Sequence, residues 1–347
     1  MNDLTTRIEG RAGRITFTRP KALNALSPDM SVAIERALDA WRDDPQVAII
    51  VIDAEGERAF CAGGDVADIY HHGRAGDTEF GRTFWRQEYR MNAKLASYPK
   101  PVAAFMQGFT MGGGVGVGCH VAHRTVCESS QIAMPECGIG LIPDVGGTLL
   151  LARAPGRMGE YLGLTAARMG AGDAIHAGFA DHFIAQEAWP NLIAHLSATG
   201  EIGLIADAAR PAPASDLARL QPQIDAAFSG ATLADILGAV DASTDAAFAE
   251  ATQKPLRRNA PLAMGCTLEM IRRARGFDSV EQALELEFRY TARAQEQGDF
   301  LEGVRAQIID KDRNPTWAHS APPTAAEIDK MLAPLGDAAL NLHGELT

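Results

Sequence analysis

Two glycine clusters are the features of this sequence best suited to chemistry on a carbonyl group. The first, Ala62-Gly63-Gly64-Asp65, comes shortly after a predicted strand, and the second, Gly112-Gly113-Gly114, follows another. Glycine lets the backbone approach a ligand closely, and a turn from strand to helix presents free N–H groups. Two such groups directed at one point can stabilise an oxyanion. Because glycine also serves tight turns and the chain contains 34 glycines, each cluster alone favours a structural role.

Three acidic residues provide groups that could move protons or attack a carbonyl. Glu136 follows a short predicted strand, Asp144 lies in a Pro-Asp turn, and Glu88 lies in a predicted amphipathic helix. A positioned carboxylate can act as a general acid, a general base or a nucleophile. By position alone, Glu136 would be an exposed turn residue and Glu88 a solvated helix residue. Asp144 would be a turn former or a helix cap. Two glycine clusters followed by Glu136 shift the balance towards a reactive site.

The histidine and cysteine residues predict neither a metal site nor a disulfide framework. His71 and His72 are adjacent, which is a poor arrangement for two ligands on one helical face. His120 and His123 have helical spacing but no acidic third ligand nearby. The five cysteines are odd in number and form no Cys-x-x-Cys pair, so we expect reduced, buried thiols. The standard phosphate-loop, dinucleotide, Gly-x-Ser-x-Gly and His-Glu-x-x-His motifs are absent, which excludes several enzyme classes.

The composition describes a large globular chain with an excess of negative charge. Its 347 residues are 46% hydrophobic, and 32 basic against 44 acidic residues give a formal net charge of -12. This balance argues against broad nucleic-acid binding, which needs a basic face. No apolar run approaches the roughly 20 residues that span a bilayer, and Met1–Leu4 does not begin like a secretory signal. We therefore expect a cytoplasmic protein with no nucleic-acid or membrane partner.

Predicted strands and helices alternate along the first part of the chain, which is typical of an α/β domain. Val47–Ile52 and Val102–Met106 are continuous apolar runs, as in strands buried on both faces. Helical patterning follows over Glu79–Leu95, and after about residue 200 the pattern is almost wholly helical. We therefore predict a core over residues 1–205 and a helical C-terminal region over residues 206–347.

The sequence resembles the crotonase superfamily, also called the enoyl-CoA hydratase/isomerase superfamily. The order and spacing of the shared motifs are specific, and they cover roughly the first 200 residues. Three further features are similar to the 3-hydroxyisobutyryl-CoA hydrolase branch: an acidic-aromatic helix, an aspartate that hydratases usually lack, and a C-terminal tail. The superfamily stretches are Arg19–Leu26, Ala59–Asp65, Gln107–Gly114, Ala133–Glu136 and Pro143–Gly147, and the branch features are Phe84–Tyr89, Asp144, Phe300–Arg305 and Asp310–Asp312.

This resemblance implies a crotonase-type spiral of ββα units, a helical C-terminal region, and an acyl-CoA thioester as ligand. The backbone N–H groups of Gly64 and Gly113 would form the oxyanion hole around the thioester carbonyl. No metal or organic cofactor is implied, because CoA is the carrier part of the substrate. Whether the chain forms a homo-oligomer is left open. Substrate contacts along the CoA are implied for Lys21, Ala62, Asp65 and Val66.

The acid and base positions separate two reactions of the superfamily. Hydratases use two glutamates, one to activate water and one to protonate the α-carbon. The second matches Glu136, but the position of the first is Gly116, which cannot transfer a proton. Thioester hydrolysis instead needs a nucleophile and a stabilised oxyanion. We expect Glu136 to attack the carbonyl or activate water, and Asp144 to position water, shuttle a proton or bind the 3-hydroxyl. Glu88 matches an acyl-pocket position of the branch.

The resemblance therefore predicts hydrolysis of a short, branched 3-hydroxyacyl-CoA, which in the branch serves valine breakdown. An alternative is an enoyl-CoA hydratase or isomerase that uses Asp144 or Glu88 in place of the missing glutamate. A third hypothesis is a non-catalytic acyl-CoA-binding protein, in which Glu136→Gln would leave CoA binding unchanged. The sequence does not separate 3-hydroxyisobutyryl from 3-hydroxypropionyl, since one methyl group changes binding by only about 1–3 kcal/mol.

Overall fold

The computed structural model describes residues 3–342 and divides the chain into two compact units that are interleaved in sequence. Met1 and Asn2, part of the stretch considered for a secretory signal, lie outside the described residues. The predicted division into residues 1–205 and 206–347 stays a prediction. The first unit comprises Met1–Gly64, Gln87–Ala133 and Arg168–Asp216, and the second comprises Asp65–Arg86, Met134–Ala167 and Leu217–Thr347.

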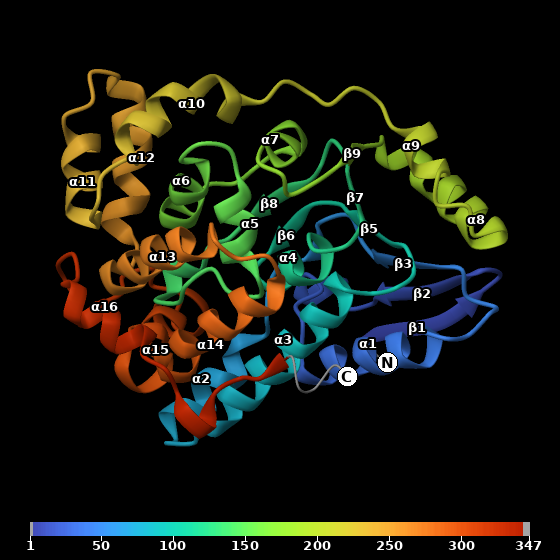
Figure 1. Ribbon diagram of the computed structural model, residues 1–347, viewed down its shortest axis with the longest axis horizontal. Coiled ribbons are helices and arrows are strands. Elements are labelled where there is room, and N and C mark those ends of the chain that lie inside the picture. The colour runs from blue at the N-terminus through green and yellow to red at the C-terminus, as the bar shows by residue number, and fades with distance from the viewer. Residues whose placement is uncertain (1–2, 343–347) are drawn as a thin grey trace. The chain divides into compact units, whose positions relative to one another are not determined.

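Within residues 3–342, the first unit holds a six-stranded sheet in the order β1-β2-β3-β5-β7-β9 and a three-stranded sheet in the order β4-β6-β8 (Figure 1). β1 and β2 pair antiparallel, and the other neighbouring pairs are parallel. Consecutive strands from β3 to β8 alternate between the two sheets, which confirms the α/β class and the spiral of ββα units. The strands are β1 (Leu4–Glu9), β2 (Ala12–Phe17), β3 (Ile49–Ala54), β4 (Ala59–Cys61), β5 (Val102–Met106), β6 (Phe109–Met111), β7 (His123–Val126), β8 (Gln131–Ala133) and β9 (His182–Phe183).

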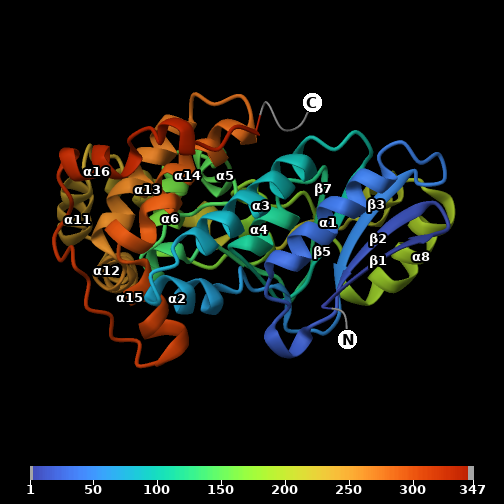
Figure 2. The same cartoon turned by 90° about the horizontal axis from the view of Figure 1, so that it is seen from below.

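Helices α1 (Pro28–Trp41) and α8 (Trp189–Thr199) cover opposite faces of the six-stranded sheet (Figure 2). Successive side chains of a strand point to opposite faces. On β2, Gly13 therefore lies against Trp41 of α1, whereas Ala12 belongs to a buried cluster that includes residues of α8. With both faces covered, β5 is apolar throughout and β3 is apolar from Ile49 to Ile52, as the sequence predicts.

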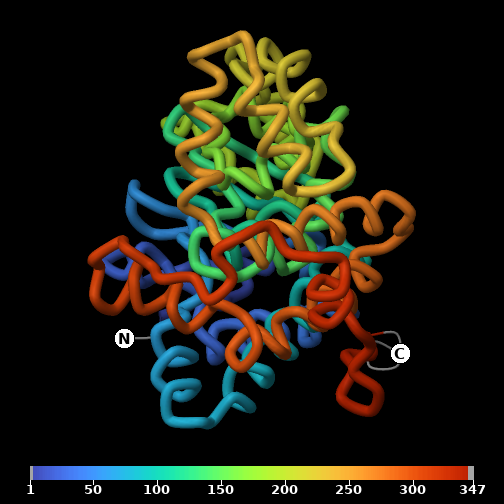
Figure 3. The backbone as a smooth tube through the Cα atoms, turned by 90° about the vertical axis from the view of Figure 1, so that its left-hand side faces the viewer, coloured from blue at the N-terminus to red at the C-terminus, as the bar shows by residue number. Residues whose placement is uncertain are grey.

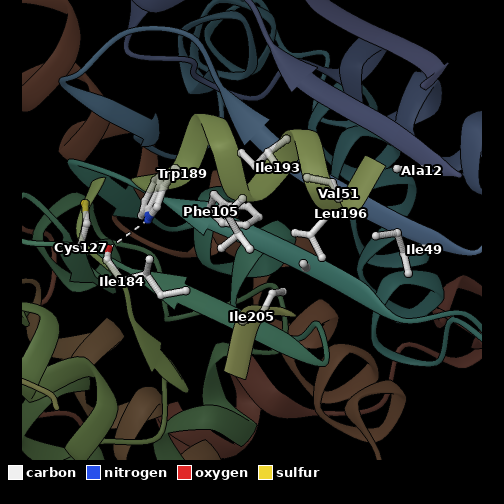
Figure 4. Close-up of a cluster of buried hydrophobic side chains, with 12 residues drawn as sticks. Ala12, Ile49, Val51, Phe105, Cys127, Ile184, Trp189, Ile193, Leu196 and Ile205 are labelled. Carbon is white, nitrogen blue, oxygen red and sulfur yellow. Dashed lines mark hydrogen bonds between the residues drawn. The ribbon is translucent and has the colours of Figure 1, made fainter. Parts of the chain in front are cut away.

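The cluster under α8 is the hydrophobic core of this face (Figure 4). Trp189 packs its ring edge-on to Phe105 and donates its indole N–H to the Ile184 carbonyl at 3.0 Å. This hydrogen bond satisfies the one polar group of a side chain that is otherwise buried in apolar surroundings. The other members are Ala12, Ile49, Val51, Ala103, Cys127, Leu192, Ile193, Leu196 and Ile205.

The remaining helices of the first unit are short. They are α4 (Gly113–Gly118), α7 (Ala171–His176) and α9 (Leu204–Ala208). The longer α3 (Glu79–Ala96) contributes its residues 79–86 to the second unit and 87–96 to the first. No helix within residues 3–342 combines the length and the apolar composition that crossing a membrane requires.

The second unit is helical in its described part, which agrees with the helical C-terminal region that the sequence predicts. Its α13 packs against α5, α6 and α14. After α15 the chain forms a π-helical turn at Arg305–Ile309 and then runs without regular structure to α16 (Figure 3). The helices are α2 (Val66–Arg74), α5 (Gly147–Arg153), α6 (Met158–Thr165), α10 (Asp216–Ala227), α11 (Leu233–Asp241), α12 (Ala246–Arg258), α13 (Pro261–Ala274), α14 (Val280–Gln297), α15 (Phe300–Val304) and α16 (Ala325–Leu332).

Candidate active site

The first glycine cluster forms a loop after β4 that is tied to the N-terminal motif. The Ala62 N–H donates to the Leu23 carbonyl at 3.0 Å, and the Leu26 N–H donates to the Gly63 carbonyl at 2.8 Å. The Asn24 side chain donates to the Ala59 carbonyl at 2.9 Å. Hydrogen bonds to Leu23, Asn24 and Leu26 therefore hold the loop that carries Gly64.

The second glycine cluster brings its first helical residue close to that loop. A Cβ atom built on Gly113 would lie 3.3 Å from the Gly64 nitrogen and 2.6 Å from Glu88 Oε1. A Cβ atom on Gly114 would lie 2.2 Å from the Cys61 carbonyl oxygen, which no side chain could accept. The structure thus places Gly64, Gly113 and Glu88 together in the first unit, beside Gly114, where a side chain would meet backbone.

Glu88 is a buried residue of α3 and not the solvated helix residue that its position alone would favour. Only 2% of the surface of Glu88 is exposed. Burial, and with it the negative charge of Glu88, raises the pKa of the Cys61 thiol to about 12. Cys61 is therefore a neutral thiol at neutral pH.

Glu136 begins a short 3-10 turn of the second unit, Glu136–Ile139, and is buried. The C-terminal chain holds this turn from two sides. The Ala260 N–H donates to the Cys137 carbonyl at 2.9 Å, and the Tyr290 hydroxyl donates to the Gly140 carbonyl at 3.1 Å. A Cβ atom on Gly303 would lie 2.2 Å from the Ile139 carbonyl oxygen, so the chain there packs directly against the turn.

Asp144 lies in a strained turn of the same unit and is also buried. The next two residues, Val145 and Gly146, have φ angles of 54° and 79°. For a β-branched residue the left-handed region costs roughly 1–2 kcal/mol. Inside the turn, the Gly147 N–H donates to the Asp144 carbonyl at 2.7 Å. A conformation of this cost persists only where its surroundings hold it.

Glu287 of α14 supplies that restraint, and the sequence analysis missed it. Its carboxylate accepts the Gly146 N–H at 2.7 Å, the Thr148 N–H at 3.0 Å and the Thr148 hydroxyl at 2.5 Å. Burial, and then the charge of Asp144, raises the pKa of Glu287 to about 8. A signal was present in the sequence, since an acidic residue stands between Leu284 and Phe288 on a helix with an apolar face.

The residues predicted to contact CoA lie in both units, and their role stays a prediction. Lys21 is exposed in a 3-10 turn of the first unit, and Ala62 is half-buried in the loop after β4. Asp65 precedes α2 of the second unit, and Val66 is its first residue. Within residues 3–342, no three histidine, cysteine, aspartate or glutamate side chains gather as a metal site would require. The expectation of no metal and no organic cofactor stays a prediction.

Comparisons with known proteins agree with this architecture. The profile of the enoyl-CoA hydratase/isomerase family matches residues 12–332. The chain therefore belongs to the enoyl-CoA hydratase/isomerase family, as its motifs predict. It is 35% identical over 98% of its length to the 3-hydroxyisobutyryl-CoA hydrolase of Gallus gallus, whose length is 91% covered and whose name places it in the mitochondrion.

Two solved structures extend the comparison to the fold. An enoyl-CoA hydratase from Rhodobacter sphaeroides 2.4.1 is 55% identical, with a TM-score of 0.94 over 98% of this chain and 100% of that one. A carnitinyl-CoA dehydratase from Mycobacterium thermoresistibile is 40% identical, with a TM-score of 0.94 over 99% and 100%. The fold is thus shared with proteins named for hydration chemistry. The cytoplasmic location predicted from the sequence stays a prediction.

Proposed function

We propose that this protein hydrolyses a short, branched 3-hydroxyacyl-CoA thioester, namely 3-hydroxyisobutyryl-CoA, to the free acid and CoA. One observation carries the proposal: Glu136 and Asp144 are both buried carboxylates, whereas the position of the first hydratase glutamate is Gly116, inside α4. The name of the Gallus gallus relative supports the same reaction. In this proposal the product acid enters valine catabolism, and CoA is the only carrier that the reaction needs.

The proposed chemistry begins at the thioester carbonyl. The N–H groups of Gly64 and Gly113 would stabilise the oxyanion, a contribution that is typically worth about 10²–10³ in rate per donor. A carboxylate oxygen of Glu136 would attack the carbonyl carbon, the C–S bond would break, and CoA would leave as a thiolate that takes up a proton. Water would then cleave the resulting anhydride and restore the carboxylate. In the second route Glu136 would take a proton from water, which attacks directly.

The other two carboxylates would serve the hydroxyl group and the proton. Asp144 would position water or deliver the proton to the leaving thiolate. Glu88 would accept a hydrogen bond from the 3-hydroxyl of the acyl group. Site geometry supports this last role, because Glu88 Oε1 lies beside Gly113, whose N–H is assigned to the carbonyl oxygen.

Hydration of a short enoyl-CoA is the second candidate function. The position of Glu88 beside Gly113 favours it, because this carboxylate could replace the glutamate that Gly116 lacks. Both solved relatives also carry names from hydration chemistry. The reactions differ in product, since hydrolysis releases a thiol and hydration removes an alkene.

The test offers purified protein 3-hydroxyisobutyryl-CoA and crotonyl-CoA in parallel, following free thiol and alkene absorbance. Thiol release from the first substrate that falls at least about 10³-fold in Glu136→Gln supports the proposal. The matched control is Glu160→Gln, because Glu160 is an equally buried glutamate of the second unit that pairs with Arg157 and Arg275. Loss of the crotonyl alkene without thiol release would contradict the proposal and favour hydration.

A further inference from the structure

The turn that carries Asp144 is held by a residue from a distant part of the chain. Glu287 lies 141 positions from Gly146 and 139 from Thr148 in sequence, yet one carboxylate accepts hydrogen bonds from both. Oε2 takes the Gly146 N–H, and Oε1 takes the N–H and the hydroxyl of Thr148. These are the backbone donors on the C-terminal side of the turn, so the carboxylate fixes the direction in which the chain leaves Asp144.

The turn holds a backbone conformation that has a cost. Val145 and Gly146 are consecutive residues in the left-handed region, which valine rarely adopts. Within the turn, the Gly147 N–H donates to the Asp144 carbonyl and closes the backbone around both residues. Glu287 adds a second restraint from α14, because it accepts the Gly146 and Thr148 amides.

The ionised form of Glu287 is disfavoured at this place. Glu287 is fully buried, and the charge of Asp144 acts on it. Two acidic groups that interact in a buried site disfavour each other's ionised form. Because its pKa is raised to about 8, Glu287 is mostly a neutral acid at neutral pH when it takes these hydrogen bonds. The arrangement gives Asp144 both a fixed backbone and an acidic neighbour, which is how carboxyl pairs with separate roles are built.

We propose that Glu287 is a positioning residue for Asp144, which acts by anchoring the Gly146 and Thr148 amides so that the Asp144 carboxylate is presented in one orientation. This inference rests on the proposed function in one respect, because it takes Asp144 to be catalytic. Glu287 itself would not touch the substrate. A displacement of about 1 Å in a catalytic group can lower the rate by about 10²-fold.

A double-mutant cycle tests this role. We would measure kcat, KM and CoA affinity for the wild type, Glu287→Gln, Asp144→Asn and the double variant, with Glu160→Gln as the control for losing a buried glutamate. We expect Glu287→Gln to lower kcat by about 10- to 100-fold, with KM and CoA affinity within about two-fold of the wild type. Because Glu287 acts through Asp144, the double variant should match Asp144→Asn within about two-fold.

Two outcomes would overturn the inference. If the two substitutions multiply, Glu287 acts independently of Asp144, as a general structural residue would. If Glu160→Gln lowers kcat as much as Glu287→Gln, the effect belongs to any buried glutamate. Should Glu287→Gln fail to fold, Thr148→Val removes one of the three donors alone and should lower kcat in the same direction, by about two- to ten-fold, again with no further loss in Asp144→Asn.

The failure of the proposed function would look different. A wild type that releases no thiol but hydrates crotonyl-CoA would disprove the hydrolase, and the same four-variant cycle would then be read on alkene loss. An Asp144→Asn variant that retains full activity in whichever reaction the wild type performs would overturn the positioning role itself.

Discussion

The two groups of candidate catalytic residues are fixed in different ways. In the first unit, hydrogen bonds hold the loop of Gly64, and the backbone packs closely at Gly114, where a Cβ atom has no space. In the second unit, Glu136 and Asp144 lie on turns that are held by hydrogen bonds from the C-terminal helices. The amides are placed by contacts that are nearer in sequence, whereas the two carboxylates depend on partners from distant parts of the chain.

The largest expected effect comes from adding one methyl group where the backbone packs closely in the first unit. Gly114→Ala would place a Cβ atom 2.2 Å from the Cys61 carbonyl oxygen, a backbone atom that cannot turn aside. We expect a loss of more than about 3 kcal/mol in the free energy of unfolding. Gly238→Ala is the matched control, because that helical glycine has open space around its Cβ position and should gain about 0.5–1 kcal/mol. Denaturant unfolding of both variants measures the difference, and equal stabilities would refute the steric account.

Glu287, which holds the turn of Asp144, predicts that the free energy of unfolding depends on pH. The pKa of Glu287 is about 8 in the folded protein against an ordinary value of 4.5, so between these values the folded state binds more protons than the unfolded state. Stability from this group is therefore present at low pH and is lost as pH rises towards 8, by up to about 1.4 kcal/mol per pH unit. In Glu287→Gln this slope should disappear. Urea unfolding at pH 5, 6, 7 and 8 measures it, and parallel curves for the two proteins would contradict the prediction.

The smallest expected effect concerns the turn that carries Glu136. Tyr290→Phe removes the hydroxyl that donates to the Gly140 carbonyl and leaves the buried ring in place. We expect a loss of about 1 kcal/mol in the free energy of unfolding and a few-fold decrease in kcat. Thermal unfolding and the thiol assay measure the two effects. A decrease as large as that of Glu287→Gln would show that one hydrogen bond, rather than several, orients this turn.

The sequence predicts the first group of residues better than the second for a physical reason. Glycine clusters after apolar strands are local patterns, and Val102–Met106 forms β5 with the bounds that its apolar run indicates. Ser27 likewise caps α1 by accepting the Met30 N–H, and a serine before a proline is a local signal for a helix start. The turns of Glu136 and Asp144 are instead held by hydrogen bonds from residues that are distant in sequence. Glu287 and Tyr290 meet their partners 139 to 150 positions away, and no local periodicity encodes such a pairing.

The sequence also does not predict the burial of Glu88 or two of the short strands. Glu88 lies in a helix whose pattern permits a solvated position, and only the packing of α4 shows that it is enclosed. The strands β4 and β6 are three residues long, too short for an alternating pattern to be recognised. Both belong to the smaller sheet, and the two glycine clusters directly follow the C-terminal ends of these strands.

The interleaving of the two units has a consequence for synthesis. The segment with Glu136 and Asp144 leaves the ribosome before α13 and α14, whose residues hold both turns. Tyr290 follows Gly140 by 150 positions, so at roughly 5–20 residues per second this support is translated roughly 8–30 s later. Until then both turns lack these hydrogen bonds, so a message truncated before α13 would yield a polypeptide with the motifs of the family and without the bonds that hold either turn.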